Sequence, residues 1–171
     1  YGVDGKKYIL ITMHRRENWG KPMEETLKAV RDYMEKHKDI YLVFPMHLNP
    51  LVRNTAHRVL DGFERKILIE PLEYLEFIAI MDGAYYIMTD SGGVQEEAPS
   101  LGKPTLVLRD TTERPEAIEA GTAKLTGTKY ENVIKDMELL EGEAYEKMSK
   151  ANNPYGDGKT SERIRKYLET I

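Results

Sequence analysis

The sequence contains no cysteine, and this absence excludes several kinds of site. None of the 171 residues can form a disulfide, hold zinc through a thiolate or act as a sulfur nucleophile. A chain of this length buries about 70% of the surface that it exposes when extended, so it needs no such crosslink for stability. The lack of cysteine also fits a reducing compartment, and we expect a cytoplasmic protein.

Long apolar runs and an excess of charge are also missing. The longest apolar runs reach about six residues, whereas a helix that crosses a bilayer needs about 20. Lys and Arg total 25 against 29 Asp and Glu, a net charge of −4. We therefore expect neither a membrane nor a nucleic acid as a partner. The first residue is Tyr1 and no leader precedes the first apolar run, so we expect a trimmed tag or a piece of a longer protein.

Short apolar runs alternate with helical patterns along most of the chain. The runs consist mostly of consecutive apolar residues, which is typical of strands covered on both faces. They predict six strands, at residues 8–13, 40–45, 67–69, 84–89, 105–108 and 123–125. Helical spacing predicts a first helix behind Pro22 and further helices at 51–60, 74–81, 94–101, 115–120, about 133–140, 144–150 and 161–170. The alternation predicts an α/β fold, a Rossmann-like three-layer sandwich with a parallel sheet of about six strands, in one domain over residues 1–171.

Polar and charged side chains with chemical potential follow the carboxyl ends of the predicted strands. His14-Arg-Arg-Glu-Asn18 follows the first strand, His47 the second, Asp90-Ser-Gly-Gly93 the fourth and Arg109–Pro115 the fifth. Ligands of parallel α/β sheets bind outside the carboxyl ends of the strands. The sequence therefore predicts one binding site along one edge of the sheet.

The segment 90–97, Asp-Ser-Gly-Gly-Val-Gln-Glu-Glu, runs from a strand through two glycines into a helix. Unpaired N–H groups at a helix start attract phosphate, and glycines let it approach the backbone closely. Ser91 adds a hydroxyl donor, and Glu97 lies about one turn later, where a carboxylate can bind ribose hydroxyls. A tight turn without a ligand is the alternative. No Gly-x-Gly-x-x-Gly fingerprint and no P-loop occurs.

The other candidates also have structural alternatives. His14, Arg15 and Arg114 can donate to phosphate or can belong to solvated loops. Arg114 is a better candidate than Arg109, because Pro115 starts a helix directly after Arg114 and fixes its position. Phe77 is either a core residue or a face on which a nucleobase stacks. No nucleophile elbow and no His-Glu-x-x-His motif occurs, so neither a catalytic triad nor a metal site is predicted.

Four motifs in order resemble the non-hydrolysing UDP-N-acetylglucosamine 2-epimerases. They are Thr-Met-His-Arg-Arg-Glu-Asn at 12–18, Pro-Met-His-Leu-Asn-Pro at 45–50, Thr-Asp-Ser-Gly-Gly-Val-Gln-Glu-Glu-Ala-Pro at 89–99 and Arg-Asp-Thr-Thr-Glu-Arg-Pro-Glu at 109–116. Asn-Pro-Tyr-Gly-Asp-Gly at 153–158 is similar too, so the resemblance covers nearly all of the chain.

The resemblance implies half of an enzyme. The chain matches the C-terminal, UDP-binding domain of a two-domain protein of the GT-B type. The N-terminal domain, with the carboxylates that move the C2 proton, is then missing, and the chain alone is expected to be inactive. The implied reaction interconverts UDP-N-acetylglucosamine and UDP-N-acetylmannosamine by elimination and re-addition of UDP through enzyme-bound 2-acetamidoglucal, without a cofactor.

The resemblance also implies residue roles. Its phosphate-binding residues correspond to His14, Ser91, Gly92, Gly93 and Arg114. His14 is the group best placed to stabilise the leaving UDP, and Glu97 matches the ribose-binding acid. Phe77 and the backbone near Leu72 match the uracil pocket, although the family often has glutamine at the position of Leu72. Arg15 and His47 match residues that, in bacterial members, help bind a second UDP-N-acetylglucosamine as an allosteric activator.

The expected partners are UDP or its N-acetylglucosamine conjugate, the missing N-terminal domain and, in the whole enzyme, a second subunit of a homodimer. We expect the last helix, 161–170, to pack toward the other domain, or to remain with its own or swing free in an isolated fragment. Three alternatives remain open at this point. They are the donor domain of a GT-B glycosyltransferase that uses a UDP-sugar, an epimerase that releases free N-acetylmannosamine, and a free-standing UDP-sugar-binding module.

Overall fold

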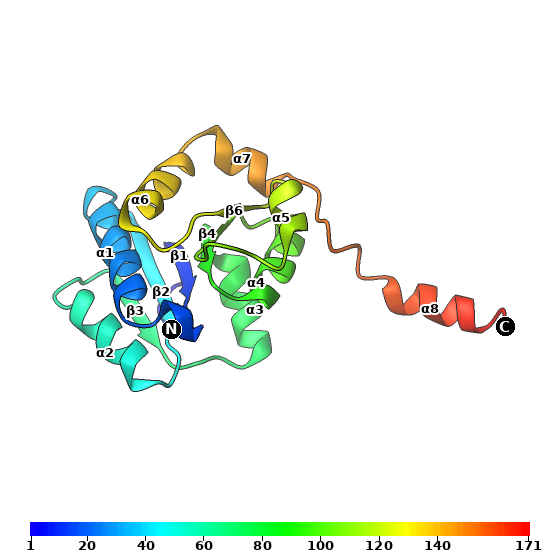
Figure 1. Cartoon of the computed structure of the whole chain (residues 1–171), viewed down its shortest axis with the longest axis horizontal. Helices are drawn as coiled ribbons and strands as arrows, with labels where there is room; N and C mark the ends of the chain where they lie inside the picture. The colour runs from blue at the N-terminus through cyan, green and yellow to red at the C-terminus, as the bar shows by residue number, and fades with distance from the viewer.

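Six parallel strands form one sheet in the computed structural model, which describes residues 1–171 (Figure 1). They are β1 (Lys7–Thr12), β2 (Ile40–Pro45), β3 (Lys66–Ile69), β4 (Tyr86–Thr89), β5 (Thr105–Val107) and β6 (Ala123–Leu125). Their order across the sheet is β3-β2-β1-β4-β5-β6, and every neighbouring pair is parallel. The predicted parallel sheet of six strands is confirmed.

Helices connect the strands, and the last three helices follow β6 at the end of the chain. They are η1 (Arg16–Asn18), α1 (Lys21–Lys36), α2 (Pro50–Val59), α3 (Tyr74–Gly83), α4 (Gly92–Glu97), η2 (Ala98–Leu101), α5 (Pro115–Glu119), α6 (Tyr130–Leu139), α7 (Glu143–Ser149) and α8 (Thr160–Leu168). Pro22 lies in the first turn of α1, where its missing N–H leaves no intrahelical bond unmade. No helix has the combination of length and apolar character that crossing a membrane requires.

Helices cover both faces of the sheet, and the side chains of each strand alternate between them. Ile9 and Ile11 of β1 join the larger core, to which α1, α2 and α6 contribute. Tyr8 and Leu10 point to the opposite face and pack with residues of α3 and α4. Figure 1 shows these two groups of helices on opposite sides of the sheet. Burial of both faces explains why the strands read as unbroken apolar runs.

The helix predicted at 94–101 begins earlier and is divided. It starts at Gly92 as α4 and changes at Ala98 into the 3-10 turn η2. Pro99 accounts for the change, because proline has no N–H to donate to the carbonyl four residues before it. Because α4 starts at Gly92, only Asp90 and Ser91 separate its N-terminal end from the end of β4.

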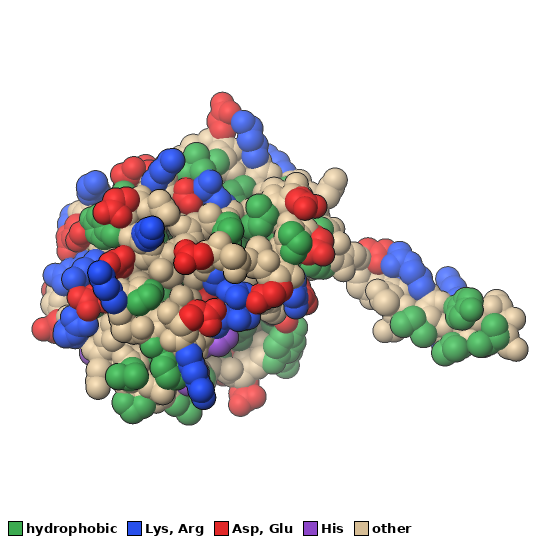
Figure 2. All heavy atoms as spheres, in the orientation of Figure 1, with side chains coloured by type: hydrophobic (Ala, Val, Ile, Leu, Met, Phe, Trp, Pro, Cys, Tyr) green, Lys and Arg blue, Asp and Glu red, His purple; other side chains and the backbone are tan.

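The last helix, α8, lies away from the three layers (Figure 1). None of its residues is buried. The segment before it is held to the body, since Asn153 Nδ2 donates to Ser100 Oγ at 2.9 Å and Tyr155 packs near Val107. Figure 2 shows apolar side chains gathered on the protruding helix. Its exposed large apolar residues are Ile164, Tyr167 and Leu168, followed by Ile171.

Candidate functional site

The order of the strands places a crevice beside the end of β1. From β1 the chain moves outward through β2 and β3, then crosses back and places β4 on the other side of β1. The connections that leave β1 and β4 therefore run to opposite faces of the sheet, and a crevice opens between them. His14 follows β1 and Ser91 follows β4, so the sheet brings together two motifs that lie 77 residues apart in the sequence.

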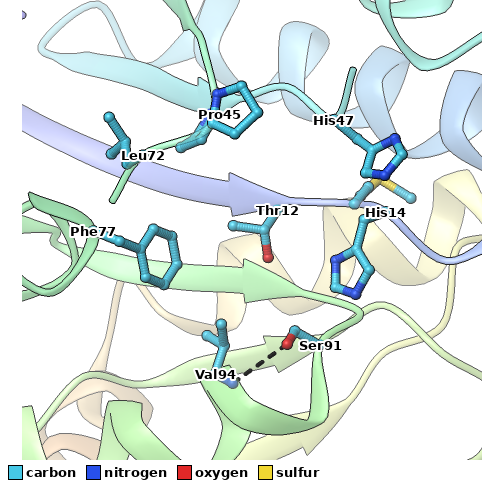
Figure 3. Close-up of a pocket in the computed structure, with 10 residues that line it drawn as sticks. Thr12, His14, Pro45, His47, Leu72, Phe77, Ser91 and Val94 are labelled. Atoms are coloured by element: carbon cyan, nitrogen blue, oxygen red, sulfur yellow. Dashed lines mark hydrogen bonds between the residues drawn. The ribbon is translucent and has the colours of Figure 1, made fainter. Parts of the chain in front are cut away.

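A cavity of about 290 Å³ lies in this crevice (Figure 3). Figure 3 shows His14, His47 and Ser91 at one end, and Leu72 and Phe77 at the other. The cavity thus has a polar end and an apolar end. Its lining residues are Thr12, Met13, His14, Pro45, His47, Pro71, Leu72, Phe77, Ser91 and Val94.

Phe77 contributes to the core and also lines the cavity. It is half-buried, and it packs against the core cluster that contains Ile80 and Met81 of its own helix, α3. It also forms part of the cavity wall opposite His14. An aromatic ring held in this way presents a face to the cavity at little cost in side-chain freedom.

The polar end is organised by Asp90, whose side chain is completely buried. Its carboxylate accepts hydrogen bonds from the backbone N–H groups of His14 (3.1 Å) and Arg15 (3.0 Å) and from Asn18 Nδ2 (2.9 Å). His14 Nδ1 lies 3.3 Å from Asp90 Oδ1. The loop after β1 is therefore folded around one carboxylate from the end of β4.

Threonine hydroxyls connect the two central strands just below the cavity. Thr12 Oγ1 and Thr89 Oγ1 lie 2.6 Å apart, and Thr89 Oγ1 also accepts from the backbone N–H of Ser91 (3.0 Å). Ser91 is the N-cap of α4, and its hydroxyl accepts from the N–H of Val94 at 3.5 Å, the bond drawn in Figure 3. These contacts fix the turn from which α4 starts.

The two glycines keep the start of α4 uncovered. Neither has a positive φ, so the backbone conformation does not require glycine at these positions. A Cβ atom at Gly92 would have Arg114 Nη2, at 3.8 Å, as its nearest neighbour, and one at Gly93 would lie 3.9 Å from Ser91 Oγ. The space above the helix start is therefore open, with Arg114 beside it.

Arg114 is held by α4 and by its own loop. Its Nε donates to Glu96 Oε1, and its Nη1 donates to the carbonyl of Glu113 at 3.0 Å. The contact with Glu96 raises the pKa of Arg114. The remaining nitrogen, Nη2, faces Gly92. The guanidinium thus keeps one donor group on the side of the glycines.

Arg109 supports this loop from beneath. It is nearly buried and donates through both terminal nitrogens to the carboxylate of Glu113. Hydrogen bonding to Arg109 lowers the pKa of Glu113 to about 2. Both arginines therefore pair with an acid, but Arg109 uses both terminal nitrogens on Glu113, whereas Arg114 keeps Nη2 beside Gly92.

Five predicted residues lie outside the lining of the cavity, namely Gly92, Gly93 and Arg114 and also Arg15 and Glu97. The Arg15 Nε donates to the carbonyl of Asp90 at 2.9 Å, and its terminal nitrogens lie near Glu17 and Glu113. The side chain of Glu97 is half-exposed and makes no hydrogen bond or ion pair within the chain. His47 is part of the lining, and its Nδ1 accepts from the N–H of Asn49 (3.1 Å), which leaves Nε2 available. The activator site at Arg15 and His47 stays a prediction.

Sequence reasoning assigned no role to Asp90 or Glu96. Both stand inside the motif at 89–99, but their partners lie far away in the sequence, on the loops after β1 and β5. An acid at the last position before a turn, directly after four buried strand residues, was the available signal for Asp90. No group of three or more potential ligand side chains is placed to hold a metal ion.

Comparison with known proteins identifies relatives along the whole chain. The profile of the UDP-N-acetylglucosamine 2-epimerase family matches residues 2–169. The Bacillus subtilis (strain 168) UDP-N-acetylglucosamine 2-epimerase is 55% identical over 164 residues, which cover 95% of this chain and 43% of that protein.

Solved structures agree with the sequence relatives. S. aureus MnaA in a co-structure with UDP is 52% identical, with a TM-score of 0.91 over 97% of this chain and 47% of that one. The Neisseria meningitidis UDP-GlcNAc 2-epimerase bound to UDP-GlcNAc is 48% identical, with a TM-score of 0.90 over 98% of this chain and 46% of that one. The chain thus spans less than half the length of these relatives and forms about half of their GT-B fold. It belongs to the UDP-N-acetylglucosamine 2-epimerase family.

Proposed function

We propose that this chain is the UDP-binding, C-terminal half of a non-hydrolysing UDP-N-acetylglucosamine 2-epimerase. The observation that carries the proposal is the cavity at the end of β1, which is polar near His14 and Ser91 and apolar near Leu72 and Phe77. A nucleoside diphosphate has the same division, since its phosphates are charged and its base is flat and largely apolar. Relatives bound to UDP and to UDP-GlcNAc support this choice of ligand.

In the proposed binding mode, the diphosphate lies over the start of α4. Gly92 and Gly93 offer backbone N–H groups there and Ser91 offers its hydroxyl, and the absence of side chains on the glycines lets phosphate oxygens reach the backbone. His14 and the free side of Arg114 add donors from the neighbouring loops. All of these groups are fixed by other contacts, so they need little reorganisation when an anion arrives.

The nucleoside occupies the other end in this proposal. Glu97 lies beyond the first turn of α4 without a partner in the chain, so its carboxylate is free to accept from ribose hydroxyls. Phe77 stacks on the uracil, while Leu72 contributes its backbone rather than its side chain. The replacement of the usual glutamine by Leu72 is compatible with a backbone contact.

The proposed chemistry is an elimination followed by an addition. A base on the other domain removes the C2 proton, the C2–H electron pair forms a C1=C2 bond, and the C1–O pair leaves with the β-phosphate of UDP. Addition of UDP at C1 and of a proton at the opposite face of C2 completes the epimerisation. The leaving oxygen gains negative charge, which His14 and Arg114 stabilise where it forms. The chain needs no cofactor for this role.

The second half of the active site comes from the part of the protein that lies outside this chain. We propose that the apolar side of α8, with Ile164 and Tyr167, packs on that domain, since these side chains have no partner here. The whole enzyme is then a cytoplasmic homodimer with one complete cleft per subunit. The isolated chain binds UDP but does not epimerise the sugar.

Titration calorimetry with UDP tests the site. We expect Glu97→Ala to weaken binding at least tenfold, because a single hydrogen bond to a charged group contributes ~1.5–3 kcal/mol. Glu64→Ala is the matched control, because Glu64 is an exposed acid near the amino end of β3, at the opposite edge of the sheet. Equal affinities of the two variants would contradict the assignment of Glu97.

Proton NMR of the full-length enzyme tests the reaction. With UDP-GlcNAc alone, an epimerase produces the anomeric signal of the UDP-linked manno isomer. A glycosyltransferase produces no such signal without an acceptor, and a hydrolysing epimerase produces free N-acetylmannosamine. Turnover by the 171-residue chain alone would contradict the division of labour between the two halves.

A further inference from the structure

We propose that Asp90 is a positioning residue for His14. It holds the imidazole with Nδ1–H directed at Asp90 Oδ1 and leaves Nε2 for the ligand. The pairing itself rests on contacts within the chain. The identity of the group that meets Nε2, a phosphate oxygen of UDP, rests on the proposed function.

The surroundings of Asp90 determine where each of its oxygens points. The side chain is fully buried, and a buried carboxylate must have its oxygens satisfied by donors. Oδ2 accepts from the N–H of Arg15 and from Asn18 Nδ2. The N–H of His14 is shared between both oxygens at 3.1 Å. Oδ1 thus has a lone pair left for His14 Nδ1, which lies 3.3 Å away.

This arrangement selects one tautomer of His14. A carboxylate can only accept, so the ring nitrogen that faces it carries the proton. Neutral His14 is therefore expected as the Nδ1–H form, whereas histidine free in water prefers Nε2–H. The ring is nearly half exposed and lies in the lining of the cavity, so Nε2 is the nitrogen left for a ligand.

The tautomer matters for an anionic ligand. With Nδ1–H fixed, Nε2 of the neutral ring has a lone pair and can take up a proton. The resulting imidazolium is balanced by the Asp90 carboxylate and donates Nε2–H to a phosphate oxygen. That hydrogen bond strengthens as negative charge grows on the departing phosphate. Asp90 does not touch the ligand in this arrangement and acts only through His14.

Long-range ¹H–¹⁵N NMR of the chain without UDP tests the pairing directly. The chain has four histidines, and His14→Gln identifies the His14 signals by their loss. The spectrum is recorded at about pH 8.5 to favour neutral imidazole rings. We expect the Nδ1–H pattern for His14. The Nε2–H pattern in the wild-type chain would overturn the proposal without any variant.

Asp90→Asn provides the second measurement. The amide oxygen is expected to stay where Arg15 and Asn18 donate, so its NH₂ group faces His14 Nδ1 and the neutral ring changes to Nε2–H. Asn18→Ala removes another Asp90 contact but leaves Oδ1 next to His14, so it retains the Nδ1–H pattern. A shift of the tautomer in both variants, or in neither, contradicts the proposed pairing.

UDP titration connects the pairing with the ligand. We expect Asp90→Asn to bind UDP about tenfold more weakly than the wild-type chain, because a neutral Nε2–H ring donates a weaker hydrogen bond to phosphate than the imidazolium that Asp90 balances. Unchanged affinity despite a changed tautomer would show that Asp90 does not position His14 for the ligand. If the wild-type chain has the Nδ1–H pattern but does not bind UDP, the pairing stands and the proposed function fails.

Discussion

Gly92 is the residue at which binding and folding can be separated most clearly. A methyl group there meets nothing closer than 3.8 Å, and the backbone does not have a positive φ. We expect Gly92→Ala to leave the free energy of unfolding unchanged or to raise it by up to ~1 kcal/mol, because alanine lowers the entropy of the unfolded chain. UDP binding should weaken at least tenfold, since the methyl group occupies the space through which phosphate reaches the backbone.

Urea denaturation and calorimetry measure these two effects. Gly142→Ala is the matched control, because this glycine also has open space and a negative φ, at the start of α7. It should leave both stability and UDP affinity nearly unchanged. Similar UDP affinities for the two alanine variants would mean that no phosphate lies over Gly92.

Phe77 permits a test of the apolar end. Phe77→Leu keeps most of the packing against the α3 core and should cost less than about 1.5 kcal/mol of stability. It removes the aromatic face, and base stacking contributes ~1–3 kcal/mol per base, so UDP affinity should fall by about one to two orders of magnitude. Pyrophosphate has no base and should bind both proteins equally. A parallel loss for pyrophosphate would place Phe77 at the phosphates instead.

The contacts of Asp90 could not be predicted from the sequence. Its motif was recognisable, and Ser91, Gly92 and Gly93 were predicted within it as phosphate-binding residues. Its partners are donors that lie 72 to 76 residues earlier in the sequence. Only the parallel pairing of β1 with β4 brings them together, and no local pattern reports such a contact. The Glu96–Arg114 pair joins residues 18 apart, and it depends in the same way on the pairing of β4 with β5.

At the scale of elements, α3 packs closely on β1 at Gly83. Tyr8 donates its hydroxyl to the Ile80 carbonyl at 2.6 Å, and a Cβ atom at Gly83 would overlap that hydroxyl. We expect Gly83→Ala to destabilise the fold by about 1–3 kcal/mol. In the double variant with Tyr8→Phe the overlapping oxygen is absent, so the two costs should fall short of additivity by at least ~1 kcal/mol. Urea denaturation of the four proteins of the cycle measures this, and strict additivity would rule out the overlap.

Glu24 joins α1 to α2 through Arg58 and also pairs with Lys28. Hydrogen bonds to these two cations lower the pKa of Glu24 to about 2, from 4.5. A lowered pKa in the folded state stabilises the fold above pH 4.5, and the contribution disappears as the pH falls toward 2. Glu24→Gln should therefore be less stable than wild type at pH 7, with a difference that shrinks at about pH 3 and in high salt. A difference independent of pH would mean that the charge is not its cause.

The elements themselves were largely predictable, and the exceptions have local causes. Strands buried on both faces are read from unbroken apolar runs, and β2 was predicted at its observed bounds, Ile40–Pro45. One continuous helix was predicted at 94–101, but Pro99 removes a backbone donor and turns its last part into a 3-10 turn. For α8 the amphipathic pattern predicts a helix but does not say which surface covers its apolar side.

At the scale of the whole molecule, α8 makes no contribution to the buried core. Replacing Ile164 and Leu168 with lysine should therefore change the free energy of unfolding by less than about 0.5 kcal/mol and leave UDP affinity unchanged. The same variant should reduce any self-association of the isolated chain in light scattering, because it removes an exposed apolar surface. A large loss of stability would show that α8 packs on its own domain in solution.

Because β1 pairs with β4, the contacts of Asp90 can form only after β4 has been synthesised. The backbone N–H groups of His14 and Arg15, which donate to the Asp90 carboxylate, are synthesised before it. Arg15 precedes Asp90 by 75 residues in the sequence. At translation rates of about 5–20 residues per second, these donors wait roughly 4–15 s for their acceptor. During this interval only β1, β2 and β3 can pair, with an open edge on β1. The nascent chain is thus most vulnerable to misassociation just before β4 emerges, at the exposed edge of β1, the strand that borders the cavity.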